Sequence, residues 1–366
     1  MVEWKKLGDL CTIKTGKLNA NAQVENGDYP FFTCDANPYK IDKYAFDTEA
    51  LLLSGNGSQV GHLNYYKGKF NAYQRTYVLD RFSGIDIFYL YHYMKGTIRQ
   101  YVMDKSKKGS VPYITLPMLQ DFRIPIPSLD EQNRIVGILD TFTASIDNLK
   151  EQIAQRRKQY EYYRDQLLDL EGKEGVEMKS LGEIGEFIRG NGIQKSDFVE
   201  EGFSCIHYGQ IHAKYGFSAE ETISKIDEVL YKRCKKAKKG DVVLATTSED
   251  AEGVAKPFVW LGEEDAAVSG DAFIYHHNQN GKFMGYLFLT HKFMQFKVKY
   301  ATGAKVVRIS GDNMAKYEVA LPSLEKQNEI VSILDTFEAS IQNLEAQLSQ
   351  REKQYEYYRN KLLTFE

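Results

Sequence analysis

The chain has 366 residues, 43% of them hydrophobic, and a formal net charge of −3. This length predicts two or three domains. The N-terminal residues hold no apolar run for export, and no stretch reaches the roughly 18 apolar residues of a membrane helix, so we expect a cytoplasmic protein without a membrane partner. The four cysteines (Cys11, Cys34, Cys205 and Cys234) form no CxxC pair and no metal-ligand spacing, which is typical of reduced thiols.

The first region, residues 1–127, has the pattern of a mixed α+β domain. An apolar run at 50–53 predicts a buried strand, and a polar, glycine-containing loop follows it at 54–62. A second strand is predicted at 76–79 and an aromatic-rich helix at 85–103. The mixture of short strands and helices predicts the α+β class for this domain.

Residues 128–172 have the periodicity of one long helix. Their apolar residues are spaced alternately by four and three, which places them at the a and d positions of a coiled coil. Ser128 and Glu131 fit a capping box at the start, and Gly172 is expected to end the helix. About 40 residues at 1.5 Å each give a helix of roughly 60 Å.

The third region, residues 173–322, repeats the plan of the first with little sequence in common. Leu181-Gly182 matches Leu7-Gly8, and Gly190 matches Gly16. The corresponding expected elements are strands at 242–244 and 272–275, a polar loop at 245–253 and a helix at 282–300.

Residues 323–366 repeat the long helix almost unchanged. Of the 42 positions aligned between 127–168 and 322–363, 29 are identical, with no gap and a constant offset of 195. The chain is therefore a repeat of two halves, each a globular region followed by a long helix. In the second copy Lys326 takes the place of the capping glutamate, which predicts a weaker cap.

Two helices with the same apolar seam can bury each other, and the 150-residue region between them lets the chain return. We therefore predict an antiparallel coiled coil with pseudo-two-fold symmetry. The alternative is a surface helix whose seam packs on its own globular region. The predicted seam residues are Ile135, Leu139, Phe142, Ile146, Leu149, Ile153, Arg156, Tyr160, Tyr163 and Leu167, and Ile330, Leu334, Phe337, Ile341, Leu344, Leu348, Arg351, Tyr355, Tyr358 and Leu362.

The charge is unevenly distributed. Residues 128–172 carry 6 basic and 9 acidic residues, and 323–366 carry 5 and 8, so each long helix is net −3 and the remaining regions together are net +3. This distribution permits nucleic-acid binding by the globular regions but falls short of the strongly basic surface of a self-sufficient DNA-binding protein.

The sequence shows no catalytic constellation. Asn37-Pro38-Tyr39 lacks the second proline of the adenine-methyltransferase signature, and there is no GxxxxGK[ST] loop for ATP. The histidines lack metal-ligand spacing. We therefore expect a chain that is not an enzyme and binds no cofactor or metal itself.

The layout resembles the specificity subunit of type I restriction-modification systems. Two divergent globular regions precede two near-identical helices, each with PSLxxQN at its start and KQYEYYRxxLL near its end. The resemblance covers the whole chain and implies four parts: target recognition domains at 1–127 and 173–322, and spacer helices at 128–172 and 323–366. It also implies that each target recognition domain reads one half of a bipartite DNA sequence.

The same resemblance implies partners. The helices would dock two modification subunits, which hold S-adenosylmethionine and methylate adenine, and two restriction subunits, which hydrolyse ATP with Mg²⁺, would complete the complex.

Candidate DNA-binding residues follow from side-chain chemistry, because paired donors and acceptors read bases and lysine or arginine holds phosphate. Each of them could instead be an ordinary solvated residue. In the first region the predicted base readers are Asn56, Ser58, Gln59, Gln74 and Arg75, with Lys14, Lys107 and Lys108 on phosphates. In the second they are Gln194, Gln210, Thr247 and Ser248, with Arg189, Lys256, Lys305 and Arg308 on the backbone.

Three further questions stay open at this level. The basic run KRCKKAKK at 232–239 could lie along a phosphate backbone or be a solvated turn. The chain could be a coiled-coil scaffold that binds only proteins, or a self-contained methyltransferase, although the missing motifs argue against the latter. The YEYY tyrosines repeat identically and are therefore expected to serve helix packing or partner docking rather than base stacking.

Overall fold

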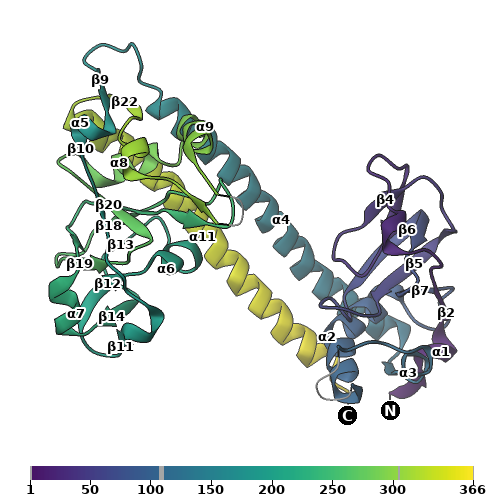
Figure 1. The fold of residues 1–366 in the computed structure, drawn as a ribbon. Coiled ribbons are helices and arrows are strands. Elements are labelled where there is room, and N and C mark those ends of the chain that lie inside the picture. Colours follow the sequence, from purple (N-terminus) through teal and green to yellow (C-terminus); the bar gives the residue numbers. More distant parts are fainter. Residues whose placement is uncertain (1, 107–110, 304–305, 366) are drawn as a thin grey trace. The chain divides into compact units, whose positions relative to one another are not determined.

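The computed structural model describes residues 2–106, 111–303 and 306–365. It divides into two compact units. The first unit comprises Met1–Glu151 with Glu345–Glu366, and the second unit comprises Gln152–Leu344. Each contains one α+β region and parts of two long helices, α4 (Leu129–Leu168) and α11 (Leu324–Leu362) (Figure 1). None of the helices in residues 2–106, 111–303 and 306–365 combines the length and the apolar character of a membrane span.

The first unit is built on a six-stranded sheet. Its strand order is β2-β7-β5-β6-β3-β4, and the predicted strands at 50–53 and 76–79 are the interior strands β5 and β7. Leu51 and Leu53 of β5 face the core that includes α2, whereas Ala50 and Leu52 face a smaller core on the other side. Burial on both faces explains why this run is apolar without alternation. The strands are β2 (Thr12–Thr15), β3 (Tyr29–Phe32), β4 (Tyr39–Ile41), β5 (Phe46–Ser54), β6 (Leu63–Ala72) and β7 (Thr76–Asp80), and the helix is α2 (Ile87–Lys105).

The second unit has the same central strands in a five-stranded sheet ordered β10-β20-β16-β18-β13. Here Val242 and Leu244 of β16 face one core and Val243 and Ala245 face another. The elements are β10 (Gly185–Arg189), β13 (Ser218–Ala219), β16 (Val242–Ala245), β18 (Lys256–Trp260) and β20 (Ala272–His277), with helices α6 (Tyr208–Ala213), α8 (Gly281–Leu287) and α9 (His291–Tyr300).

The second unit also holds a sheet that the sequence did not predict. Its order is β11-β14-β12-β19-β15, and its strands are two to four residues long. These are β11 (Phe198–Val199), β12 (Phe203–Ile206), β14 (Ser224–Ile226), β15 (Lys236–Ala237) and β19 (Ala266–Val268), beside α7 (Glu228–Arg233).

A short antiparallel ribbon leads into each long helix. In the first unit β1 (Glu3–Lys6) pairs with β8 (Arg123–Ile126), and in the second β9 (Glu177–Ser180) pairs with β22 (Glu318–Leu321). The short helices beside the ribbons are α1 (Leu7–Leu10) and α3 (Leu116–Gln120), and α5 (Leu181–Ile184) and α10 (Gly311–Met314).

The matched glycines of the two halves lie where backbones approach closely. A Cβ on Gly16 would lie 1.8 Å from the carbonyl oxygen of Ala72, and one on Gly190 would lie 2.3 Å from that of Ser269. Any side chain there would displace the neighbouring backbone, which explains why both halves place glycine at this position.

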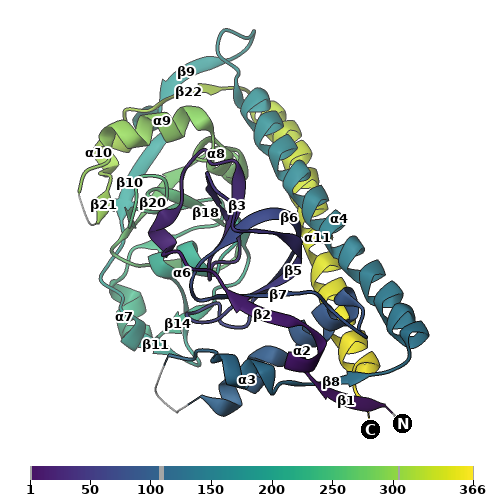
Figure 2. The same cartoon turned by 90° about the vertical axis from the view of Figure 1, so that its right-hand side faces the viewer.

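Within each unit the two long helices run antiparallel and pack against each other (Figure 2). In the first unit Phe142 stacks on Tyr358, with ring centroids 5.2 Å apart. In the second unit the equivalent residues, Phe337 and Tyr163, stack at 5.4 Å. The predicted fold class, an α+β chain whose two long helices form an antiparallel pair, is confirmed, and the two units repeat one plan.

The seam residues pack on more than the other helix. Ile135 and Leu139 of α4 share one core with the α2 residues of the first unit and with Tyr355 of α11. In the second unit Ile330 and Leu334 of α11 share a core with α8 and α9. Both packing modes considered from the sequence are therefore present, because the start of each helix belongs to a globular core as well as to the helix pair.

A buried glutamine explains the PSLxxQN motif. Gln132 is 1% exposed; its Oε1 accepts from the backbone N–H of Asp86, and its Nε2 donates to the carbonyl of Pro127. Gln327, 0% exposed, likewise accepts from the N–H of Asn280 and donates to the carbonyl of Pro322. Asp86 and Asn280 are the N-caps of α2 and α8, so this glutamine fastens a helix of the globular region to the start of the long helix.

A repeated aspartate forms a second connection, with different partners in the two units. In the first unit Asp140 lies 2.9 Å from Nε2 of His92, whose other ring nitrogen lies 3.0 Å from the hydroxyl of Tyr355. In the second unit Asp335 accepts from Lys282 and from the hydroxyl of Tyr286. Burial lowers the pKa of His92 and raises that of Tyr355 to about 12.

Three local predictions were wrong. The first long helix ends at Leu168 rather than at Gly172, which lies in the following turn with φ +74°. The segment 282–300 forms two helices, because the hydroxyl of Thr290 caps α9. Glu131 does not complete the capping box: it pairs with Arg134, while Ser128 and Ser323 both accept a backbone N–H from the first turn.

Candidate nucleic-acid interface

In the first unit four connecting segments at one end of the sheet are hydrogen-bonded together. The backbone N–H of Gly55 donates to the carbonyl of Arg75 at 2.9 Å, which joins the loop after β5 to the turn before β7. The thiol of Cys34 contacts both Oδ1 of Asn56 and the carbonyl of Arg75. Gln74 donates to Oδ1 of Asn19 at 2.9 Å. The side-chain amides of Asn56, Gln74 and Asn19 are thus gathered at this end of the sheet. We call Asn56, Gln74, Arg75 and the loop residues joined to them the first loop cluster.

The second unit carries an equivalent cluster after β16. Thr247 and Ser248 form the two-residue strand β17, which pairs with β21 (Val307–Arg308). The hydroxyl of Thr247 lies 3.2 Å from Oδ1 of Asp271, and its carbonyl lies 2.9 Å from Nε2 of His212. We call this group the second loop cluster.

The two clusters occupy corresponding positions. Asn56 forms an antiparallel bridge with Tyr113 in the first unit, and Thr247 pairs with Arg308 in the second. Tyr113 and Arg308 are separated by the same 195 residues as the helix repeat. Sequence reasoning missed Tyr113, which is 54% exposed, although the alignment of VPYIT at 111–115 with VVRIS at 306–310 was a signal that could have found it.

Lys256 lies beside the second loop cluster. It is the first residue of β18, and its Nζ donates to the carbonyl of His212 at 3.2 Å. Burial lowers the pKa of this lysine. The interaction with His212 ties Lys256 to the same α6 residue whose ring contacts Thr247.

The remaining predicted DNA-binding residues are distributed as follows. Ser58 and Gln59 are exposed in the loop of the first cluster, and Lys14 is exposed on the edge strand β2. Arg189 ends β10 and donates to the carbonyl of Gly270, next to Asp271 of the second cluster. Gln194 is exposed on the connection that follows β10. Lys107, Lys108 and Lys305 lie outside the described residues.

Gln210 points inward in this structure. It is 7% exposed, and its Nε2 donates to the hydroxyl of Ser224 at 2.6 Å. Its Oε1 is buried without a partner among the described residues. To contact a base, the side chain of Gln210 would first have to break its hydrogen bond with Ser224 and become exposed.

The basic run at 232–239 is not one helical face. It spans the end of α7 and the strand β15, and several of its charges are engaged locally. Lys232 pairs with Glu228, Lys239 pairs with Glu263, and Lys236 lies over the ring of Tyr231. These contacts favour the reading as a solvated, locally neutralised turn.

The repeated tyrosines present the same surface in both units. Tyr162 and Tyr357 are 62% and 60% exposed, and each packs edge-on against the following tyrosine. Tyr160 and Tyr355 are instead directed inward, to Glu338 and His92 respectively.

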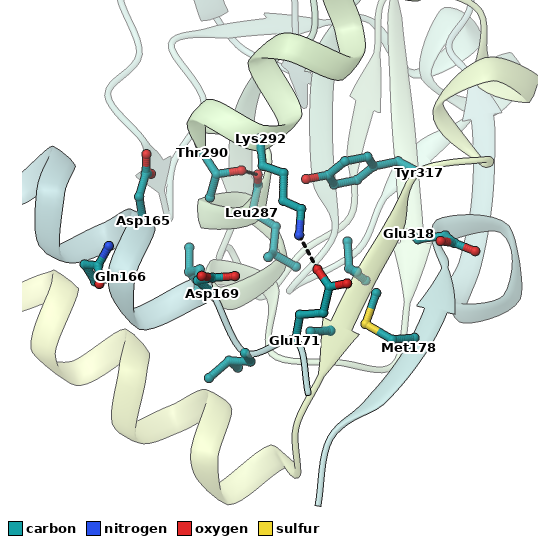
Figure 3. Close-up of a pocket in the computed structure, with 14 residues that line it drawn as sticks. Asp165, Gln166, Asp169, Glu171, Met178, Leu287, Thr290, Lys292, Tyr317 and Glu318 are labelled. Carbon is teal, nitrogen blue, oxygen red and sulfur yellow. Dashed lines mark hydrogen bonds and ion pairs between the residues drawn. The ribbon is translucent and has the colours of Figure 1, made fainter. Parts of the chain in front are cut away.

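A pocket of the second unit lies away from the second loop cluster. It is lined by the end of α4, the ribbon β9–β22 and the start of α9, and Lys292 pairs with Glu171 across it (Figure 3). Nearby, the backbone N–H of His291 donates to Oδ2 of Asp165 of α4. None of the predicted DNA-binding residues lines this pocket, and we interpret it as part of the contact between helix and globular region.

Comparison with known proteins shows which family has this architecture. The family described as type I restriction modification DNA specificity domain matches residues 1–156 and 173–352. The EcoDI specificity subunit of Escherichia coli is 42% identical over 164 residues, which cover 43% of this chain and 36% of that protein. A putative type I restriction enzyme specificity subunit of Haemophilus influenzae is 26% identical over 100% of this chain and 96% of its own length.

A solved structure shares the fold. The crystal structure of the S subunit of a type I restriction-modification system from M. genitalium aligns with a TM-score of 0.61 over 100% of this chain and 97% of that one, at 16% identity. The chain belongs to the family of type I restriction-modification DNA specificity subunits.

Proposed function

We propose that this chain is a non-catalytic subunit that recognises a bipartite, asymmetric sequence in double-stranded DNA. One half-site is read by the first loop cluster and the other by the second. A single observation carries the proposal: the two units repeat one scaffold, whereas the corresponding positions of their loop clusters hold different side chains. Asn56 and Tyr113 in one unit correspond to Thr247 and Arg308 in the other.

Different side chains on the same scaffold imply different half-sites. Arginine makes bidentate contacts with guanine in the major groove, and asparagine makes them with adenine. Half-sites approached from one side of the duplex lie about 34–36 Å apart, one helical turn. An unread gap would then separate them, and inserting residues into one long helix should change the tolerated gap without changing either half-site.

The same proposal assigns the helix pair to partner binding. Tyr162 and Tyr357 offer matching exposed aromatic surface in the two units, which supports one kind of partner docking twice. We assign this surface to two modification subunits that carry S-adenosylmethionine, with two restriction subunits that use ATP and Mg²⁺ completing the assembly. The mild +3 charge outside the long helices is explained if the modification subunits contribute phosphate contacts.

The test is mapping of methylated adenines in a genome that carries this gene, with and without it, together with duplex binding by the chain assembled with its modification subunits. We expect one bipartite motif to lose methylation and binding to weaken steeply with salt. The competing function is a coiled-coil scaffold that binds only proteins. That function predicts an unchanged methylation map and no salt-dependent preference for any duplex.

A further inference from the structure

Lys297 of α9 is a buried lysine in the second unit. Only 3% of it is exposed, and lysine is rarely buried to this extent without a compensating partner. Its Nζ donates to two backbone carbonyls of one loop, those of Glu252 and Val254, the latter at 2.8 Å. Burial lowers the pKa of Lys297 to about 8, and the carboxylates of Asp250 and Glu252 counter part of this shift.

The loop that Lys297 holds is the one that begins with the second loop cluster. It connects β16 to β18 and presents Thr247 and Ser248 near its start. Its first part is fixed by Asp271, whose carbonyl accepts from Thr246 and whose carboxylate accepts from Thr247. Lys297 fixes its last part.

The loop needs this support because its conformation is restrictive. Ala255, at its end, has a φ of +56°, which is unfavourable for a residue with a Cβ. The backbone N–H of Gly253 donates to Oδ1 of Asp250, which closes a turn within the loop. A backbone held in this way persists only where surrounding contacts over-determine it.

In the first unit the corresponding loop is held without a charged side chain. The α2 residue 195 positions before Lys297 is Val102, which is fully buried. Val60 of the loop after β5 lies in the same apolar core as Val102, and Gly61 of that loop packs against the backbone of Arg99 in α2. Apolar packing therefore seats the loop in one unit, and an ammonium group seats it in the other.

We infer that Lys297 is a positioning residue for DNA reading by the second unit, because its ammonium group fixes the loop that presents Thr247 and Ser248. The inference rests on the proposed function for its DNA consequence, but the fixing of the loop does not. Removing the ammonium leaves two loop carbonyls without their donor while most of the apolar side chain can be kept. The half-site read by the first unit is unaffected, since Val102 carries no such group.

The experiment compares three variants of the full chain. Lys297→Met keeps the approximate length of the side chain and removes charge and donors, and Lys297→Arg restores both. Lys299→Met is the matched control, because Lys299 is an exposed lysine of the same helix. If Lys297→Met does not accumulate as folded protein, Lys297→Gln serves in its place, since its neutral amide can donate but carries no charge.

The first readout is amide hydrogen exchange of residues 247–254 in the free chain. We expect exchange about tenfold faster in Lys297→Met, as for loss of a charge-assisted hydrogen bond, with wild-type behaviour in Lys299→Met and substantial recovery in Lys297→Arg. Unchanged exchange in Lys297→Met would overturn the inference, whatever happens with DNA.

The second readout is methylation of duplex libraries randomised in one half-site at a time, with modification subunits present. We expect Lys297→Met to lose about tenfold of its discrimination at one half-site and none at the other. Faster loop exchange with both half-site preferences intact would refute the positioning role. Absence of any sequence preference in the wild-type assembly would refute the proposed function. The hydrogen-exchange result would then still decide whether Lys297 fixes the loop.

Discussion

The two units differ in the side chains of their loop clusters. They agree in the buried glutamines that join the globular region to the long helix and in the stacked aromatic pairs between the helices. Gln132 and Gln327 make the same pair of backbone hydrogen bonds, and Phe142–Tyr358 and Tyr163–Phe337 form matching stacks. The loop clusters share only their backbone pairing. The repeated glutamines and aromatic residues thus belong to the shared scaffold, and we propose that the unrepeated residues of the loop clusters determine what each unit recognises.

The comparison is tested most strongly at the buried glutamines. Replacing Gln132 by Leu leaves the N–H of Asp86 and the carbonyl of Pro127 without partners, and Gln327→Leu does the same to Asn280 and Pro322. We expect each variant to lose about 2–4 kcal/mol of unfolding free energy in its own unit. Hydrogen exchange with denaturant, resolved by unit, measures this. The exposed Asn133→Leu serves as the control, and losses in only one unit would mean that the glutamines are not equivalent.

Acid should destabilise the second unit through His277. Burial lowers the pKa of this histidine from 6.5 to about 4. The unfolded chain therefore binds a proton between about pH 6.5 and pH 4 that the folded chain does not, so stability present above pH 6.5 is lost as the pH falls through this window. We expect a loss on the order of 3 kcal/mol. The measurement is the urea midpoint between pH 7 and pH 4, in which His277→Gln should flatten the pH dependence; an unaltered slope would contradict the assignment.

The helix-pair stacks should contribute equally in the two units. A double-mutant cycle on Phe142 and Tyr358, each changed to Leu, should give a coupling free energy of about 0.5–1.5 kcal/mol, and a cycle on Tyr163 and Phe337 should give the same value within error. Thermal or chemical unfolding of the single and double variants supplies the cycle. A coupling free energy in only one of the two pairs would show that the two stacks contribute unequally to stability despite their similar geometry.

The sequence predicted the large features because each left a periodic or repeated signal. The long helices, the repeat of whole halves and the central strands β5 and β16 were all predicted correctly. The second sheet of the second unit was missed because its strands of two to four residues are too short to show periodicity. The break between α8 and α9 depends on one capping threonine, Thr290, inside a stretch that is otherwise helical in composition.

The candidate reading residues were harder, for a physical reason. Side chains on exposed loops follow no period, so polar chemistry was the only guide, and it could not separate the inward-facing Gln210 from the more accessible Arg308. Tyr113 was missed because tyrosine is not one of the residue types that typically contact base edges. Its alignment with Arg308 across the repeat nevertheless places both residues at the corresponding position of the two loop clusters. The positions assigned to DNA stay predictions.

The most direct test of two independent readers uses paired substitutions at corresponding positions. Target sequences selected by the assembled methyltransferase are compared for wild type, for Asn56→Ala with Tyr113→Ala, and for Thr247→Ala with Arg308→Ala. We predict that each pair relaxes one half-site by about 1–3 kcal/mol of discrimination per lost base contact and leaves the other half-site unchanged. Relaxation of both half-sites by either pair, or of neither half-site by both pairs, would contradict the account.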